Sequence, residues 1–218
     1  MKQTCFVPTL SFPKLVPFFF LFLVMAATSL LSCSESDEVD EYAGWRDRNQ
    51  QFVDSVARVA RSNTDGTWAV YPAFNMGDGL SADASTNYFV YVQKLEQGSG
   101  SYSPVYSDSV RVHYSGRLIS SSNYSSGYCF DKSFSGTSLN VATDVPNLLG
   151  MGGTVTGFST ALMHMVEGDH CLIIVPYYLG YGENGRSAAS IPGYSTLIFD
   201  VKLAKIYRYK VDTDTSWW

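Results

Sequence analysis

The feature that most constrains the fold is a repeated alternation of apolar and polar residues with a period of two. The clearest case lies near the end of the chain, where the apolar positions are Leu197, Phe199, Val201 and Leu203. Successive side chains of a β-strand point to opposite faces of a sheet, so this alternation predicts strands with one buried face. The segment from Val110 to Gly116 alternates in the same way, and the segments 87–95 and 171–175 are also typical of strands. Such a chain folds around a β-sheet.

One segment among these strands follows the periodicity of a helix instead. In residues 158–166 the apolar positions are Phe158, Ala161, Leu162 and Met165, spaced i, i+3, i+4 and i+7. Gly168 is a plausible end for this helix, because glycine readily adopts the left-handed conformation that terminates helices. A single short helix among alternating strands predicts the α+β class with an antiparallel sheet.

A longer helix is predicted ahead of the strands, over residues 45–61. Its apolar stripe consists of Phe52, Val53, Val56, Val59 and Ala60. The helix packs on its own domain in the simpler interpretation and forms a dimer contact in the alternative. Residues 67–85 hold aromatic residues among Gly and Pro and predict irregular, packed structure. Residues 45–86 are therefore expected to form an N-terminal helical and irregular extension.

The first 32 residues have the pattern of a secretory signal peptide. Lys2 and Lys14 precede an apolar run over residues 15–31 that ends in small residues. An uncleaved membrane anchor is the alternative, although such an anchor needs about 20 apolar residues. The sequence Leu30-Leu31-Ser32-Cys33 resembles the bacterial lipobox. This resemblance implies that Cys33 becomes the lipidated N-terminus, held in a membrane by its acyl chains.

An acidic segment follows the cysteine, and we expect residues 33–44 to form a solvated tether. It is similar to the tethers of surface-exported lipoproteins of the Bacteroidetes. The resulting expectation is a cell-envelope protein, lipid-anchored to the outer membrane on its periplasmic or its surface face. Residues 208–218 are expected to form a C-terminal tail.

The charged and metal-binding residue types point away from two classes of protein. The net charge is −5, and an acidic chain repels phosphate backbones, so nucleic acid is not an expected partner. The four cysteines form no CxxC pair and the histidines form no HExxH motif, so no metal site is expected. The histidines, His113, His164 and His170, are predicted at the surface. After lipidation Cys129 and Cys171 are left to pair, and the sequence does not say whether they do.

One stretch runs from Val110 to Gly116 and is followed, after a loop, by Phe130-Asp131. A second covers residues 155–168, and a third runs from Pro176 to Gly182 and is followed by residues 191–201. In this order the three stretches resemble the FKBP family of peptidyl-prolyl cis-trans isomerases. The resemblance implies an FKBP-like domain at residues 87–207, with a twisted antiparallel sheet wrapped around the short helix. It also implies an apolar cleft between them and proline-containing polypeptides as partners.

The family's pocket residues carry over onto particular positions of this chain. The positions matching the family's catalytic residues are Tyr114, Phe130, Asp131, Phe158 and Tyr181. The positions matching its further substrate-binding residues are Val145, Val155, Ile191 and Phe199. The resemblance implies wall aromatics, a rim carboxylate from Asp131, a backbone N–H from Val155 and a donating hydroxyl from Tyr181. It implies no cofactor, because the amide is rotated in a dry aromatic pocket.

Three departures from the family pattern qualify this expectation. Phe158 stands where the family usually has a floor tryptophan, and Val145 where an aromatic wall residue is usual, so activity is expected to be reduced. The family also binds macrolides of the tacrolimus type, and the loop 119–128, longer than in compact members, is an obstacle to such binding.

Two other functions compete with isomerisation. The sequence Gly157-Phe-Ser159-Thr-Ala161 differs from the GxSxG motif of hydrolases at its fifth residue, which is alanine instead of glycine. No strand plainly leads into it. The stronger alternative is a catalytically weak FKBP-like module that holds peptides, as a chaperone or a surface interaction protein. Turnover on a prolyl peptide separates that alternative from an enzyme.

Overall fold

The structure is a computed structural model that describes residues 40–77, 79–81 and 83–209. The predicted signal segment, Cys33 and most of the acidic segment lie outside the described residues, as do residues 210–218 of the predicted tail. No helix of the described part is long and apolar enough to cross a membrane.

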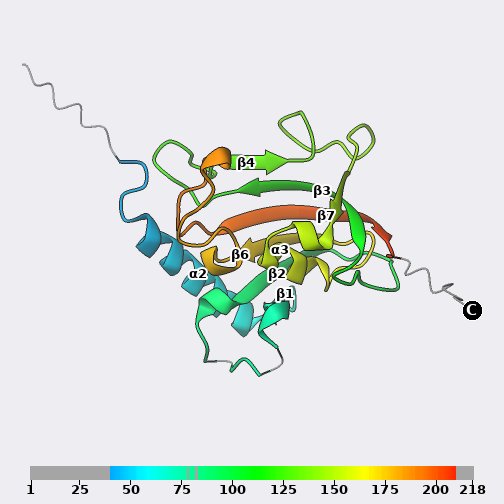
Figure 1. Ribbon diagram of the computed structural model, residues 1–218, viewed down its shortest axis with the longest axis horizontal. Helices are drawn as coiled ribbons and strands as arrows, with labels where there is room; N and C mark the ends of the chain where they lie inside the picture. Colours follow the sequence, from blue (N-terminus) through cyan, green and yellow to red (C-terminus); the bar gives the residue numbers. More distant parts are fainter. Residues whose placement is uncertain (1–39, 78, 82, 210–218) are drawn as a thin grey trace, which may run out of the picture. The chain divides into compact units, whose positions relative to one another are not determined.

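The described chain contains two α-helices, seven strands and several short 3₁₀ turns (Figure 1). The helices are α2 (Trp45–Ser62) and α3 (Thr156–Leu162). The strands are β1 (Trp68–Pro72), β2 (Phe89–Glu96), β3 (Ser109–Arg117), β4 (Cys129–Lys132), β5 (Asn147–Gly150), β6 (His170–Val175) and β7 (Leu197–Tyr207). The 3₁₀ turns are Phe74–Met76, Thr86–Tyr88, Met151–Gly153, Tyr177–Leu179 and Ser187–Ala189.

All seven strands belong to one antiparallel sheet. Its order is β1-β2-β6-β7-β3-β4 (Figure 1). β5 pairs with β3 beside this path. The longest pairing joins β3 to β7, from Ser109 opposite Tyr207 to Arg117 opposite Ile198. The predicted α+β class, with an antiparallel sheet, a short α-helix and an N-terminal helical extension, is thereby confirmed.

The short helix α3 packs on one face of the sheet and joins the main hydrophobic core. Every residue from Gly157 to Leu162 is buried, and so is Met165. The helix ends at Leu162, earlier than the predicted end at 166, because His164 and Met165 donate to carbonyls three residues back. Bonds of this kind tighten the chain into a 3₁₀-type turn.

The longer helix α2 packs on the other face of the sheet. Alternate residues of β2 divide between two cores, with Val90 and Val92 in the core that holds α3 and Tyr91 in the core that holds α2. The buried apolar residues of α2 in this second core are Val53, Ala57 and Ala60. Val59 was predicted on the same stripe, but it is 51% exposed. At 3.6 residues per turn it points roughly 120° away from Val53.

The segment between α2 and β2 contains a strand that the sequence did not predict. Residues 67–85 were expected to be irregular, but β1 pairs with β2 from Trp68 opposite Gln93 to Pro72 opposite Phe89. All but one residue of β1 are half-buried, so it shows no clean alternation of apolar and polar positions. Pro72 is tolerated because β1 is an edge strand. The predicted extension therefore shares the sheet of the domain that follows it.

Two buried polar side chains fasten α2 to the chain that leads into β7. The Trp45 indole Nε1 donates to Ser195 Oγ at 2.9 Å, and Asn49 Oδ1 accepts the Thr196 backbone N–H at 2.7 Å. Asn49 Nδ2 also donates to the Trp45 carbonyl at 2.8 Å. The bonds to Ser195 and Thr196 join residues about 150 positions apart in the sequence, so α2 is an integral part of the fold.

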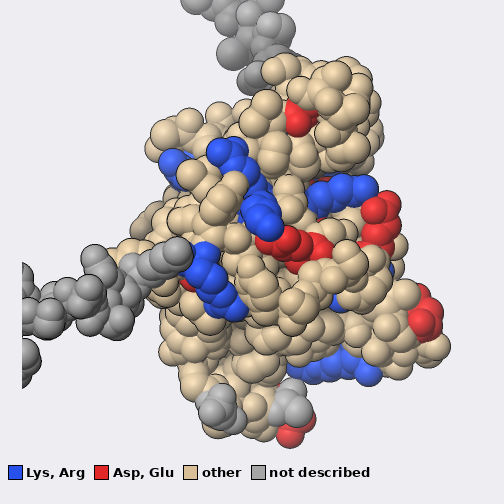
Figure 2. Space-filling view, turned by 90° about the vertical axis from the view of Figure 1, so that its right-hand side faces the viewer, with Lys and Arg blue, Asp and Glu red and all other residues tan. Residues whose placement is uncertain are grey.

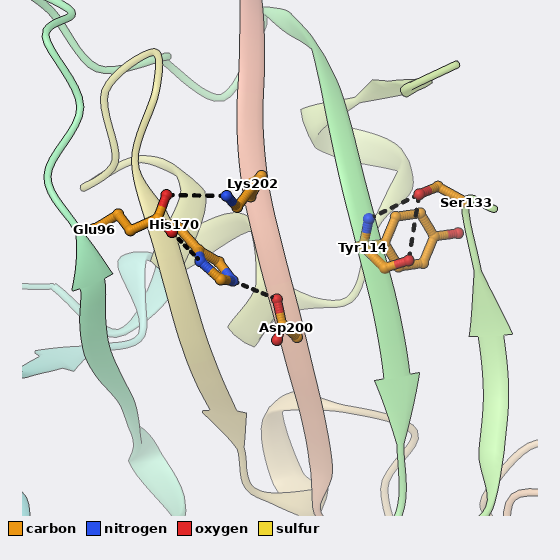
Figure 3. Close-up of polar contacts among 6 residues, drawn as sticks. All are labelled: Glu96, Tyr114, Ser133, His170, Asp200 and Lys202. Atoms are coloured by element: carbon orange, nitrogen blue, oxygen red, sulfur yellow. Dashed lines mark hydrogen bonds and ion pairs between the residues drawn. The ribbon is translucent and has the colours of Figure 1, made fainter. Parts of the chain in front are cut away.

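Polar side chains of β2, β6 and β7 are linked to one another on the face of the sheet opposite α3 (Figure 3). His170 Nε2 lies 2.7 Å from Asp200 Oδ1, and Lys202 Nζ lies 2.9 Å from Glu96 Oε2. His113, next to this network on β3, was predicted at the surface but is only 6% exposed. It shares a cavity with apolar side chains of the loop after β4, and burial lowers the pKa of its imidazole.

On the face shown in Figure 2, basic and acidic side chains are interspersed, and most of the surface is uncharged.

The two cysteines of the described residues differ in exposure. Cys129 on β4 is exposed and Cys171 on β6 is buried, and both are free thiols. Burial raises the pKa of the Cys171 thiol to about 12.

Candidate functional site

A cavity of about 330 Å³ opens between the start of α3 and the strands of its face of the sheet. The side chains and backbone that line it come from β3, β4, β5, β7, the start of α3 and the loop after β6. They are Tyr114, Phe130, Asp131, Leu149, Gly153, Thr154, Val155, Phe158, Tyr181, Arg186 and Phe199. We call this cavity the cleft.

Aromatic rings make the floor and one wall of the cleft. Phe158 is 3% exposed, and its ring centre lies 4.7 Å from that of Phe199 and 6.2 Å from that of Tyr114. Phe130 meets Phe199 edge-on at 5.6 Å. Edge-on and tilted contacts are the favoured geometries between aromatic rings, so these side chains hold one another in place.

Gly116 on β3 lets two of these rings approach each other. A Cβ atom at this position would lie 2.6 Å from the Phe130 ring and 2.9 Å from the Phe199 ring. Neither distance is compatible with ordinary van der Waals contact, so a larger residue would push a ring out of position. The glycine therefore helps to shape the wall, a role that strand periodicity does not reveal.

The rim of the cleft opposite the helix is fixed by polar contacts between β3 and β4. The Tyr114 hydroxyl donates to Asp131 Oδ2 at 2.7 Å. Burial first, and then this hydrogen bond, raise the pKa of the Tyr114 phenol, which keeps it protonated. Ser133 Oγ accepts the Tyr114 backbone N–H at 2.9 Å and donates to the Tyr114 carbonyl at 3.3 Å (Figure 3). Asp131 therefore lies at a defined place on the rim.

The start of α3 places a backbone donor at the cleft. Val155 is the N-terminal cap residue, and among the described residues no acceptor takes its N–H. Ser159 Oγ donates to the Met151 carbonyl at 2.7 Å and lies 2.6 Å from Thr154 Oγ1, which secures the turn before the helix. The Val155 N–H is thus available to a carbonyl group bound in the cleft.

The loop after β6 places Tyr181 and Arg186 at the other side of the cleft. Arg186 Nη1 donates to the Tyr181 hydroxyl at 2.9 Å, which leaves the hydroxyl proton free to be donated. The loop is closed by two backbone hydrogen bonds between Arg186 and Ile191, at 2.8 and 3.1 Å. Ile191 is buried in the core rather than lining the cleft.

The cleft brings together most of the site residues predicted from the sequence. These are Tyr114, Phe130, Asp131, Val155, Phe158, Tyr181 and Phe199. It does not bring in Ile191 or Val145, which is 71% exposed on the loop before β5. Leu149 lines the cleft instead, because the loop 137–146 ends in β5 and presents a later residue than simple spacing predicts. The roles of all these residues remain predictions.

Sequence reasoning missed Arg186, Leu149 and the turn residues Gly153 and Thr154. Arg186 lies in a loop, where no periodicity marks a side chain that faces a site. The motif Tyr181-Gly182 preceding it was the available signal, because it placed the start of this loop at the pocket.

An antiparallel sheet packed on a short helix, with an aromatic cleft at the start of that helix, is the architecture of a prolyl-isomerase-like domain. The family model for FKBP-type peptidyl-prolyl cis-trans isomerase matches residues 100–204. The chain therefore carries a domain of the FKBP-type peptidyl-prolyl cis-trans isomerase family.

Similar proteins agree with this assignment. The chain is 37% identical over 122 residues to the FKBP-type 22 kDa peptidyl-prolyl cis-trans isomerase of Escherichia coli, covering 56% of this chain and 52% of that protein. It is 35% identical over 114 residues to the macrophage infectivity potentiator of Trypanosoma cruzi, covering 52% and 51%. The chain thus spans about half the length of these curated relatives.

A solved structure shows that the architecture is shared. The crystal structure of FkpA from Escherichia coli matches with a TM-score of 0.50 at 23% sequence identity. The match covers 91% of this chain and 74% of that one. At this identity the likeness establishes the fold.

Proposed function

We propose that this chain is a peptidyl-prolyl cis-trans isomerase that acts on X-Pro bonds of envelope or extracellular polypeptides. The observation that carries the proposal is the cleft itself. It places aromatic rings, a free backbone N–H and a hydroxyl donor around one space, on a domain of the matching family.

The chemistry needed is the rotation of a peptide bond without breaking it. The barrier is about 18–20 kcal/mol, because the C–N bond has partial double-bond character. The planar amide is the more charge-separated and better hydrated form, and twisting reduces its polarity. A dry, aromatic cleft therefore disfavours the planar ground state relative to the twisted transition state.

Each part of the cleft has a proposed role in this rotation. Phe158 and Phe199 receive the proline ring and exclude water from the amide. The Val155 N–H and the Tyr181 hydroxyl donate to carbonyl groups of the substrate and hold the chain on either side of the bond. Tyr114 and Asp131 fix the rim, so that the substrate enters in one orientation.

The proposal is tested with the protein spanning residues 34–218 and a peptide containing Ala-Leu-Pro. Exchange NMR or a protease-coupled assay should show isomerisation above the spontaneous rate, at a modest level because Phe158 replaces the usual tryptophan. A folded protein that binds the peptide and leaves the rate unchanged would instead favour the peptide-holding module.

We also propose that the protein is a lipoprotein attached through Cys33. The lipobox-like sequence and the acidic residues after it support this. Beyond them, the Glu41 carboxylate accepts hydrogen bonds from Ser121 Oγ at 2.6 Å and Asn123 Nδ2 at 2.9 Å, so the domain begins close behind the segment. Cys33→Ala should abolish lipid labelling and detergent-phase partitioning. Unchanged mass and partitioning of this variant would contradict the proposal.

A further inference from the structure

Arg186 brings a positive charge to a cleft that is otherwise mostly apolar. Among the residues that line the cleft, Arg186 and Asp131 carry the formal charges. Nothing in the rotation of an amide requires a guanidinium group, and of the proposed roles only that of Tyr181, whose hydroxyl accepts from Nη1, involves it. Its position at the opening of the cleft therefore indicates a separate role.

The guanidinium is already held in place without a substrate. Its backbone is fixed by the hydrogen bonds to Ile191, and Nη1 is bonded to the Tyr181 hydroxyl at 2.9 Å. The guanidinium carbon also lies 5.3 Å from the centre of the Tyr181 ring. A preorganised side chain loses less conformational entropy when it binds a ligand.

The remaining donors of this guanidinium have no protein partner among the residues that the structure describes. Arg186 forms no ion pair with a carboxylate of the described residues, and its side chain donates to Tyr181 alone within that part of the chain. The carboxylate of the cleft, Asp131, accepts from the Tyr114 hydroxyl. The planar fork of an arginine side chain matches a carboxylate, which can accept two of its N–H groups at once.

We propose that Arg186 makes the enzyme prefer substrates with an acidic side chain directly beside the proline. This preference rests on the proposed isomerase function and names its substrate class. A glutamate or aspartate next to a proline bound over Phe158 would reach the free edge of the guanidinium. The pair would form at the partly exposed opening, where neither charge needs full desolvation.

The test compares peptide pairs that differ only in charge, because glutamate and glutamine have nearly the same shape. One pair has Ala-Glu-Pro-Phe and Ala-Gln-Pro-Phe, and the second places Glu or Gln directly after the proline. For at least one pair, kcat/KM should be about two- to fivefold higher for the glutamate peptide, as expected for a partly exposed ion pair. The ratio should fall towards one at high salt.

Three variants of the exposed side chain sharpen the test. Arg186→Gln should bring the Glu/Gln ratio to one, and Arg186→Lys should keep part of it. Arg186→Glu should reverse the preference, so that a lysine peptide exceeds its glutamine counterpart. Any loss that acts through Tyr181 affects both members of a pair and cancels in the ratio. An unchanged ratio in all variants, or an equal loss for every peptide, would overturn the proposal.

Binding titrations of the same peptides separate this proposal from the isomerase proposal. If the folded protein turns nothing over but binds the glutamate peptide more tightly in an Arg186-dependent way, the isomerase function fails and the preference stands. If turnover is measurable but neither rates nor binding distinguish glutamate from glutamine, the preference fails and the isomerase function stands.

Discussion

The sheet carries one helix on each face, and the two helices are built in different ways. α3 has seven residues, and all of them from Gly157 onward are buried. α2 has 18 residues and buries one side, while the rest of it faces solvent. α3 lies within the match to the isomerase family, and α2 precedes that match.

The difference separates two kinds of support for the cleft. α3 contributes to the cleft directly, whereas α2 supports it from the opposite face of the sheet. A helix of α3's length is not stable by itself in water. Packing on the sheet and the turn that precedes the helix must therefore stabilise α3. α3 in return supplies Phe158, the floor of the cleft. α2 has its own amphipathic pattern and reaches the site indirectly, through the bonds of Trp45 and Asn49 to the residues before β7.

The largest effect is expected from removing a core side chain of α3. Leu162 is fully buried, and Leu162→Ala should lower the free energy of unfolding by about 2–5 kcal/mol, because it leaves a cavity. Urea denaturation monitored by tryptophan fluorescence measures this loss. Val59→Ala, on the exposed side of α2, is the control and should change stability by no more than about 0.5 kcal/mol. Equal losses for the two variants would contradict the comparison.

The link between α2 and the chain before β7 should have the next largest effect. Asn49→Ala removes the acceptor of the buried Thr196 N–H, and leaving such a donor unpaired costs about 1–3 kcal/mol. The loss should appear in the same denaturation experiment, while Arg58→Ala on the exposed side of α2 leaves stability nearly unchanged. If Asn49→Ala is neutral, α2 is not fastened to the fold in the way described.

A larger residue in the cleft wall tests the face of the sheet that carries the cleft, and it changes no residue of either helix. Gly116→Ala should cost about 1–3 kcal/mol and also reduce kcat/KM, because the new methyl group displaces the ring of Phe130 or Phe199. Ser115→Ala is the matched control, because Ser115 is the neighbouring residue of β3 and points to the face of the sheet opposite the cleft. A Gly116→Ala protein of full activity would mean that the two rings can shift without consequence for the substrate.

The smallest expected effect separates activity from stability altogether. Tyr181→Phe removes the hydroxyl of a half-buried side chain that lines the cleft. The loss of one hydrogen bond of about 0.5–1.5 kcal/mol should lower kcat/KM roughly two- to tenfold. Thermal unfolding should be almost unchanged, since the ring stays in place. A large drop in melting temperature would show that the hydroxyl serves the fold instead of the substrate.

The sequence located those parts of the molecule that carry a periodic pattern or an ordered motif. Alternation marked β3 and β7, and helical spacing marked α2 and α3. β1, β4 and β5 were not predicted as strands, because they are short and lack a buried face that alternates with an exposed one. In the cleft, residues on regular elements or beside glycine motifs were placed well. Val145 was not, because the path of its loop cannot be obtained by counting residues.

The thiol of Cys129 offers a way to observe the cleft wall directly. It is exposed and adjacent in sequence to Phe130, whereas the buried Cys171, with its raised pKa, has little reactive thiolate near neutral pH. A protein that starts at residue 34 carries no other cysteine. A maleimide fluorophore should therefore attach at a single site on β4, and its emission would report whether the wall moves when a peptide arrives.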